Sequence, residues 1–83
     1  MAEFNRQDTF DKVAKIIADK LSIDTKTISG TATLQDLGAD SLDIVEIIMK
    51  MEEQLGVMIS DEQAEKLQTV DDVVGYVHSL RNK

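Results

Sequence analysis

The stretch of sequence that decides the fold reads Asp36-Leu37-Gly38-Ala39-Asp40-Ser41-Leu42-Asp43. Small residues give way here to an acid and then to apolar residues with the helical period, so we expect a helix to begin at Ser41 with Asp40 as its N-cap. Gly56 suits the left-handed position just past a helix end. The sequence therefore predicts a helix over residues 41–55 with a serine in its first turn.

Three further segments repeat their apolar residues with the helical period. They are residues 9–21, a short segment after Ser60 and a segment that opens at Thr69. The residues expected to cap them are Asp8 or Thr9 for the first, Ser60 with Gln63 for the next, and Thr69 with Asp72 for the last. Gly75 lies in the middle of the last helix, where glycine is less favourable than alanine by roughly 1 kcal/mol. Close helix packing is one reason for a glycine there.

Four amphipathic helices must share one core, and no segment alternates with the period of a strand. We therefore expect an all-α fold, a small four-helix bundle with three longer helices and one short third helix. Residues 1–83 are expected to form a single domain, with flexible ends at 1–7 and 81–83. The long connection before Asp40 should be pinned to the core by isolated apolar residues. These are Ile23, Ile28, Leu34 and Leu37.

The 83 residues carry a formal net charge of −7 and include no cysteine. Without cysteine the chain can form no disulfide or thiolate metal site and can hold no thioester on its own side chains, so any thiol must come from an attached group. The acidic surface should repel nucleic acids and anionic lipid and attract basic protein patches. With no apolar run of membrane-spanning length and no signal-peptide region in residues 1–7, we expect a cytoplasmic protein without membrane insertion. An organellar protein whose targeting segment had been removed would have the same features.

A helical wheel of residues 42–55 separates two faces. The inward face is expected to hold Ile44, Ile48, Met51 and Leu55, with Ile47 on its flank. The outward face mixes acids with two large apolar residues and consists of Leu42, Asp43, Glu46, Met49, Lys50 and Glu53, with Val45 and Glu52 at the boundary. If this face is only solvated, Lys50 pairs with Glu46 or Glu53. If it is a docking surface, the acids steer basic partners and the two apolar residues make contact.

Ser41 also has two interpretations. A serine at a helix start is most often a capping or first-turn residue. As a modification site, it would lie at the positive end of the helix dipole, which favours a phosphodiester. Gly38 and Ala39 are small and would leave room for a modifying enzyme. Asp40 and Asp43 would repel a phosphate and turn an anionic arm away from the surface.

Two other functions of this region can be set aside. A nucleophilic serine needs a base and an orienting acid, and the only histidine, His78, is expected on the surface of the last helix. No Gly-x-Ser-x-Gly elbow is present. The acids of residues 36–46 lack the alternating ligands and central glycine of a calcium-binding loop. The sequence therefore predicts no catalytic residue and no metal ligand.

The chain resembles the freestanding acyl carrier proteins of dissociated fatty-acid synthesis. The resemblance covers about residues 9–80, and its most specific part is the run of residues 36–43 followed by an acidic helix. The other matching residues are Val45-Glu46, Met49, Glu52-Glu53 and the stretches 56–66 and 69–77.

This resemblance implies that Ser41 receives a 4′-phosphopantetheine arm from coenzyme A, through a phosphopantetheinyl transferase that uses magnesium. The thiol of the arm would carry acyl groups, so the chain itself would be no enzyme. Fatty-acid synthesis and acyl-transfer enzymes would bring basic patches to a docking face, and the chain would act as a monomer. The residues implied for that face are Asp40, Leu42, Asp43, Glu46, Met49, Glu52 and Glu53.

In this family the bundle parts slightly to shelter the acyl chain. The residues implied for that cavity are Ile44, Ile48, Met51, Ile59, Leu67 and Val73. The chain departs from the family pattern at Lys50, where a small or neutral residue is usual, at Ser60, where proline is common, and in a loop over residues 34–37 that is one residue short. These departures leave open a specialised carrier of polyketide, peptide or D-alanyl groups. An alternative of a different class is an unmodified acidic helical adaptor.

Overall fold

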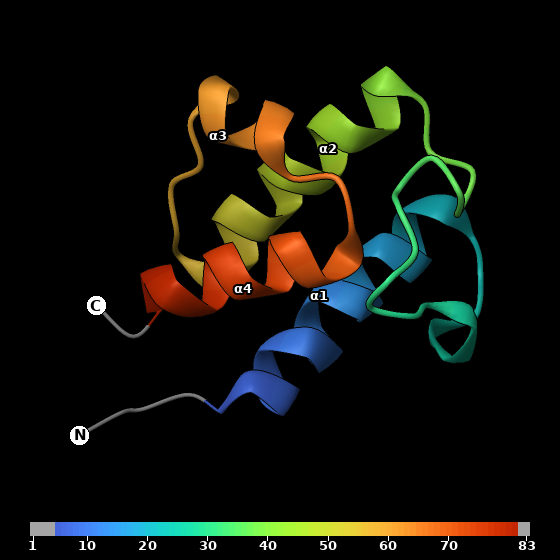
Figure 1. Cartoon of the computed structure of the whole chain (residues 1–83), viewed down its shortest axis with the longest axis horizontal. Helices are drawn as coiled ribbons and strands as arrows, with labels where there is room; N and C mark the ends of the chain where they lie inside the picture. The colour runs from blue at the N-terminus through green and yellow to red at the C-terminus, as the bar shows by residue number, and fades with distance from the viewer. Residues whose placement is uncertain (1–4, 82–83) are drawn as a thin grey trace.

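The computed structural model describes residues 5–81, which form an all-helical bundle (Figure 1). The elements are α1 (Arg6–Leu21), the 3-10 turn η1 (Thr25–Thr27), α2 (Ser41–Leu55), α3 (Asp61–Lys66) and α4 (Val70–Arg81). Three longer helices and one short third helix confirm the predicted fold class. The flexible ends predicted at 1–7 and 81–83 fall mostly outside the described residues, and residues 6, 7 and 81 are helical.

The start of α1 differs from the prediction. The helix begins at Arg6, because Asn5 is its N-cap and accepts a hydrogen bond from the Asp8 N–H at 2.7 Å. Thr9 is therefore inside the helix and is fully buried. The apolar period starts at Phe10, so periodicity alone could not reveal the polar first turn.

The other helix ends follow from the residues predicted to cap them. Gly56 adopts φ 66° and closes α2 in the left-handed conformation, as expected. The Ser60 hydroxyl accepts from the Gln63 N–H and begins α3. At the start of α4 the Asp72 N–H donates to Thr69 Oγ1, while the Thr69 N–H donates to Asp72 Oδ2.

The long connection between α1 and α2 is held in two ways. Ile28 and Leu34 are buried, and Ile23 and Leu37 pack half-buried against the core, as predicted. Backbone pairing with the segment before α4 adds a restraint that the sequence did not predict. An isolated antiparallel bridge joins Thr33 to Thr69. Beside it run the hydrogen bonds Leu34 N–H to Gln68 O, Val70 N–H to Ala32 O and Asp71 N–H to Gly30 O.

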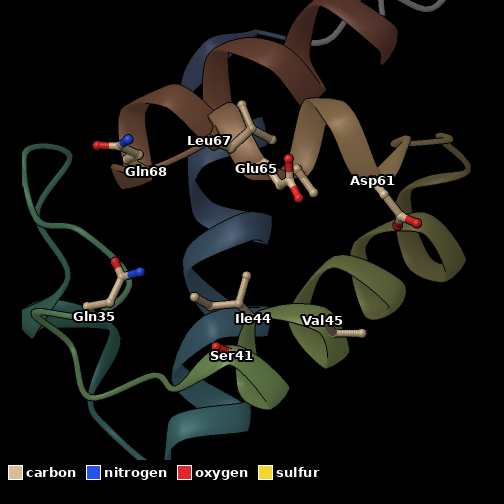
Figure 2. A pocket seen from close by; sticks show the side chains of 9 residues that line it. Gln35, Ser41, Ile44, Val45, Asp61, Glu65, Leu67 and Gln68 are labelled. Atoms are coloured by element: carbon tan, nitrogen blue, oxygen red, sulfur yellow. The ribbon is translucent and has the colours of Figure 1, made fainter.

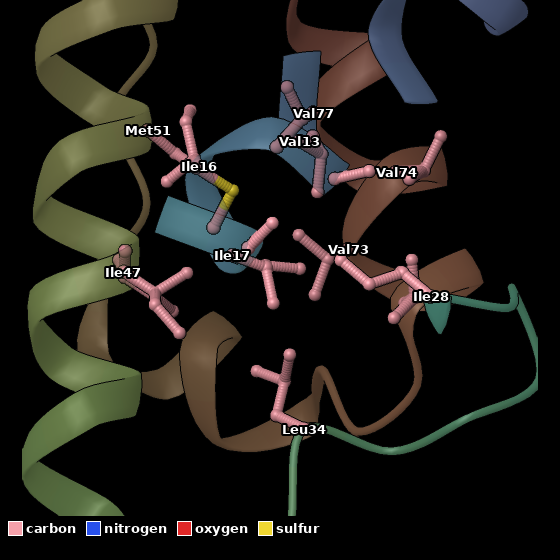
Figure 3. Close-up of a cluster of buried hydrophobic side chains, with 14 of the residues drawn as sticks. Val13, Ile16, Ile17, Ile28, Leu34, Ile47, Met51, Val73, Val74 and Val77 are labelled. Atoms are coloured by element: carbon pink, nitrogen blue, oxygen red, sulfur yellow. The ribbon is translucent and has the colours of Figure 1, made fainter. Parts of the chain in front are cut away.

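The hydrophobic core surrounds α1, which packs closely against both α2 and α4 (Figure 3). The buried side chains of Ile17, Ile47 and Val73 converge there from these three helices. Ile47 is fully buried and lies at the centre of the inward face of α2, whereas the wheel placed it on the flank. The short α3 is held mainly by half-buried Ala64 and Leu67. Within residues 5–81, no helix combines the length and apolar character needed to cross a bilayer.

Candidate functional site

Ser41 is the first residue of α2 and is exposed. The turn before it is fixed by a reciprocal capping box, in which Asp40 Oδ1 accepts from the Asp43 N–H at 2.8 Å and Asp43 Oδ2 accepts from the Asp40 N–H at 3.3 Å. The sequence predicted the Asp40 cap but not the return bond from Asp43. Both acids that flank Ser41 thus have a structural task, and they position the serine in the first turn.

The approach to Ser41 is open on the side of Gly38. This glycine has φ +99°, and a Cβ built on it would meet nothing within 4 Å. Ala39 behaves differently from the prediction, because its side chain is buried and its N–H donates to Leu34 O at 3.0 Å. The space around Gly38 is therefore open, while Ala39 anchors the loop to the core.

A pocket of about 930 Å³ opens beside Ser41, between α2 and α3. Figure 2 shows Ser41 and Ile44 on one side and Glu65 and Leu67 on the other. The full lining is Gln35, Ser41, Ile44, Val45, Asp61, Ala64, Glu65, Leu67 and Gln68. Apolar side chains from both helices and a polar rim surround a space that can take an apolar chain.

Two of the six side chains predicted to line an acyl cavity, Ile44 and Leu67, line this pocket. The other four lie in the packed core and do not line it: Ile48, Met51, Ile59 and Val73 are all buried. Ile44 and Leu67 were both implied as cavity residues by the family resemblance. Ile44 also lies on the inward face expected for its helix, and Leu67 is the C-cap that follows α3. Which apolar residues meet a pocket and which meet the core depends on the spacing of α2 and α3, and periodicity contains no information on that spacing.

The outward face of α2 carries an apolar stripe. Leu42, Val45 and Met49 are exposed by 67%, 54% and 56%. Spacings of three and four residues place them side by side along the helix. The wheel predicted Leu42 and Met49 but put Val45 at the boundary, and this same spacing could have identified it.

The acids of that face differ in the hydrogen bonds that they accept within the chain. Glu46 Oε2 accepts from Lys20 Nζ at 2.6 Å, and Glu52 Oε2 accepts from the Ile59 N–H at 2.9 Å. Glu53 is exposed. If the face were only solvated, Lys50 would pair with Glu46 or Glu53, but in the structure Glu46 pairs with Lys20 from α1. The hydrogen bond that Lys20 donates to Glu46, together with the charges of Glu46, Asp43 and Asp40, raises the pKa of Lys20.

The sequence predicted His78 on the surface of the last helix. In the structure His78 is half-buried and remote from Ser41. Its Nδ1 is 3.0 Å from Thr9 Oγ1 in the first turns of α1, whereas the Ser41 end of α2 adjoins Lys20 in the last turn. Eleven residues of helix span about 16 Å. His78 is therefore poorly placed to serve as a base for Ser41. Within residues 5–81, no cluster of three or more His, Cys, Asp or Glu side chains could hold a metal ion.

The chain is similar to known proteins in both sequence and structure. A family model described as a phosphopantetheine attachment site matches residues 11–77. A solved structure of the acyl carrier protein from Enterococcus faecalis, described for its high thermal stability, matches with a TM-score of 0.77 and 36% sequence identity. That match covers 93% of this chain and 99% of the other. Because the family model spans most of the chain and the structural match spans nearly all of it, the chain belongs to the acyl carrier family of phosphopantetheine attachment domains.

Proposed function

We propose that the chain is a carrier for fatty-acid synthesis that takes its 4′-phosphopantetheine arm on Ser41. The observation that carries this proposal is the placement of an exposed serine hydroxyl at a capped helix start, with open space at Gly38 and an apolar pocket alongside. When attached, the arm supplies the thiol that holds the acyl group as a thioester. The chain contributes the attachment point, the shelter and the recognition surface, and it performs no reaction by itself.

Attachment needs little from the chain beyond a well-placed hydroxyl. Ser41 Oγ attacks the phosphorus that bears the pantetheine in coenzyme A, a new P–O bond forms, and adenosine 3′,5′-bisphosphate leaves. The transferase, with magnesium, must supply the base that takes the Ser41 proton, since His78 lies at the other end of α1. The N–H groups of the first turn and the helix dipole favour the resulting phosphodiester. The carboxylates of Asp40 and Asp43 accept the hydrogen bonds of the capping box, so they hold the first turn that presents Ser41.

The pocket beside Ser41 is the proposed shelter for the acyl chain. Ile44, Val45, Ala64 and Leu67 give it an apolar lining. The remaining predicted lining residues, Ile48, Met51, Ile59 and Val73, would be reached only if the core opened further. A long chain would do this by parting α2 from α3, which is short and loosely held.

The outward face of α2 is the proposed docking surface for basic partners. It combines the apolar stripe of Leu42, Val45 and Met49 with a row of acids. Apolar contact within a charged rim is the usual composition of a transient interface. The acidic residues expected to steer partners are Asp40, Asp43, Glu46, Glu52 and Glu53. The partners would be the transferase and the enzymes that load and extend fatty acyl groups, met by a monomeric carrier in the cytoplasm.

The test is the intact mass of the chain before and after incubation with coenzyme A, magnesium and a phosphopantetheinyl transferase. We expect a gain of one phosphopantetheinyl group, absent in Ser41→Ala. Ser60→Ala is a matched control, because Ser60 also starts a helix and is exposed. A gain that persists in Ser41→Ala would place the arm elsewhere. No gain with two different transferases would favour an unmodified helical adaptor. Loading by acyl, aminoacyl or D-alanyl enzymes then identifies the cargo.

A further inference from the structure

Lys20 lies in the last turn of α1 and reaches across to the outward face of α2. Its ammonium group donates to Glu46 at 2.6 Å, and the two side chains are 28% and 45% exposed. The neighbouring charges of Asp43 and Asp40 act on the same ammonium group. A positive charge from within the chain therefore already occupies the acidic surface close to Ser41.

We propose that Lys20 is a specificity-determining residue that competes with the basic side chains of partner enzymes for Glu46. This inference rests on the proposed docking function of α2. A partner cation that uses Glu46 must first displace Lys20 or find another acid. Partners that contact the apolar stripe and Glu53 are unaffected, so Lys20 favours them over partners that depend on Glu46.

Glu46 differs in this respect from the other acids of the face. Asp40 and Asp43 bond to backbone N–H groups of the capping box, and Glu52 bonds to the Ile59 N–H. Those donors are fixed by the fold and cannot move aside. The donor to Glu46 is the end of a flexible lysine side chain, so its hydrogen bond can be exchanged for one to a partner.

The partial exposure of the pair sets the size of the effect. Solvent-exposed ion pairs are weak, and the competition should reduce affinity by about 2- to 5-fold. A competitor of this strength changes the order of preference among partners without blocking any of them. It should also weaken as salt concentration rises, because exposed charges are screened.

The experiment measures phosphopantetheinyl transfer to the full chain, with kcat and KM determined separately at low and at high salt. Lys20→Gln should lower KM about 2- to 5-fold at low salt and leave kcat unchanged. Lys26→Gln is the matched control, because it removes the same charge from exposed η1. Thermal melting of each variant is the check that the fold is retained.

Two further variants test the proposal without changing Lys20. In the otherwise unchanged chain, Glu46→Gln should raise KM less than Glu53→Gln, because Glu46 is already engaged. In the Lys20→Gln background, Glu46→Gln should raise KM more than it does alone.

Several outcomes would overturn the proposal that Lys20 competes with partner side chains for Glu46. Equal effects of Lys20→Gln and Lys26→Gln would mean that only net charge matters. A higher KM for Lys20→Gln would mean that Lys20 itself contacts the partner. A larger effect of Glu46→Gln than of Glu53→Gln in the unchanged chain would mean that Glu46 is fully available. Failure of the unchanged chain to gain the arm would instead contradict the proposed function. That failure is detected by intact mass and does not depend on any KM value.

Discussion

Thr9 connects the beginning of α1 to the end of α4 through one hydroxyl group. Thr9 Oγ1 accepts from Arg81 Nη1 at 2.9 Å and lies 3.0 Å from His78 Nδ1. The Arg81 side chain is only 4% exposed and also pairs with Asp8 at 3.1 Å. Burial of an arginine is tolerable only when its donors are satisfied. A threonine that looks like a helix cap in the sequence is therefore a buried acceptor in the fold.

Asp72 is the residue for which the structure predicts a pH dependence. Hydrogen bonds from the N–H groups of Thr69 and Gln68 lower the pKa of its carboxyl group. A lowered folded-state pKa stabilises the fold at pH values above the ordinary aspartate pKa of about 4, and this stability is lost as pH falls through the folded-state pKa. Asp72→Asn should therefore melt at a lower temperature than the unchanged chain at neutral pH, and the difference should shrink in acid.

Thermal melting between pH 7 and pH 2 measures this effect. Asp19→Asn is the control, because it removes one negative charge from an exposed position on α1 and touches no helix cap. If the difference between Asp72→Asn and the unchanged chain stayed constant across the range, the capping carboxylate would not be the source of the acid sensitivity.

At the scale of the elements, α2 was predicted at its observed bounds and α1 was not. For α2, a capping acid, an apolar period and a terminal glycine all agree at Asp40 and Gly56. For α1, the apolar period begins after the first turn, so it does not mark the cap at Asn5. The Asn5-x-x-Asp8 spacing was the available signal. A helix start can be predicted from sequence where cap and period coincide, and less reliably where a polar first turn separates them.

Gly75 in α4 gives a prediction at this scale. A Cβ built on it would meet only Arg6 Nη1 at 3.6 Å, which is ordinary contact, so close helix packing does not explain the glycine. Gly75→Ala should stabilise the chain by about 0.5–1 kcal/mol, because alanine loses less backbone entropy in a helix. In a domain of this size the melting temperature should rise by roughly 2–8 °C.

Gly56→Ala provides the opposite control. Its φ of +66° lies in the left-handed region, where alanine is strained by about 1–2 kcal/mol. Thermal melting should therefore separate the two substitutions in sign. A lower melting temperature for Gly75→Ala would mean that α4 needs the glycine for a reason other than packing.

At the scale of the whole molecule, the sequence predicted which residues are apolar and inward but not how the helices divide them. The pairing of residues 30–34 with residues 68–71 is made by backbone groups, and these groups are the same for every residue type. Similarly, Ile44 meets the pocket and Ile47 the core because of where α3 and α1 lie. Periodicity identifies a face of a helix, and the neighbours of that helix decide what the face contacts.

The pocket beside Ser41 is separate from the packed core, so its occupation by an acyl chain can be tested. If an acyl chain on the Ser41 arm enters the pocket, each methylene group that leaves water contributes up to about 0.8 kcal/mol. The octanoyl-loaded form should then melt several degrees above the form with a free thiol. Ala64→Trp should remove most of this difference, because Ala64 lines the pocket and the indole would fill it.

Glu62→Trp is the matched control, since Glu62 lies on α3, is exposed and does not line the pocket. It should retain the full difference in melting temperature between the loaded and unloaded forms. Comparing the two forms within each variant cancels any effect of tryptophan on the fold itself. An equal gain on loading in Ala64→Trp and in the unchanged chain would mean that the acyl chain lies elsewhere. The deeper side chains of Met51 and Val73 would then be the next place to test, because a chain that bypasses this pocket must open the core to leave water.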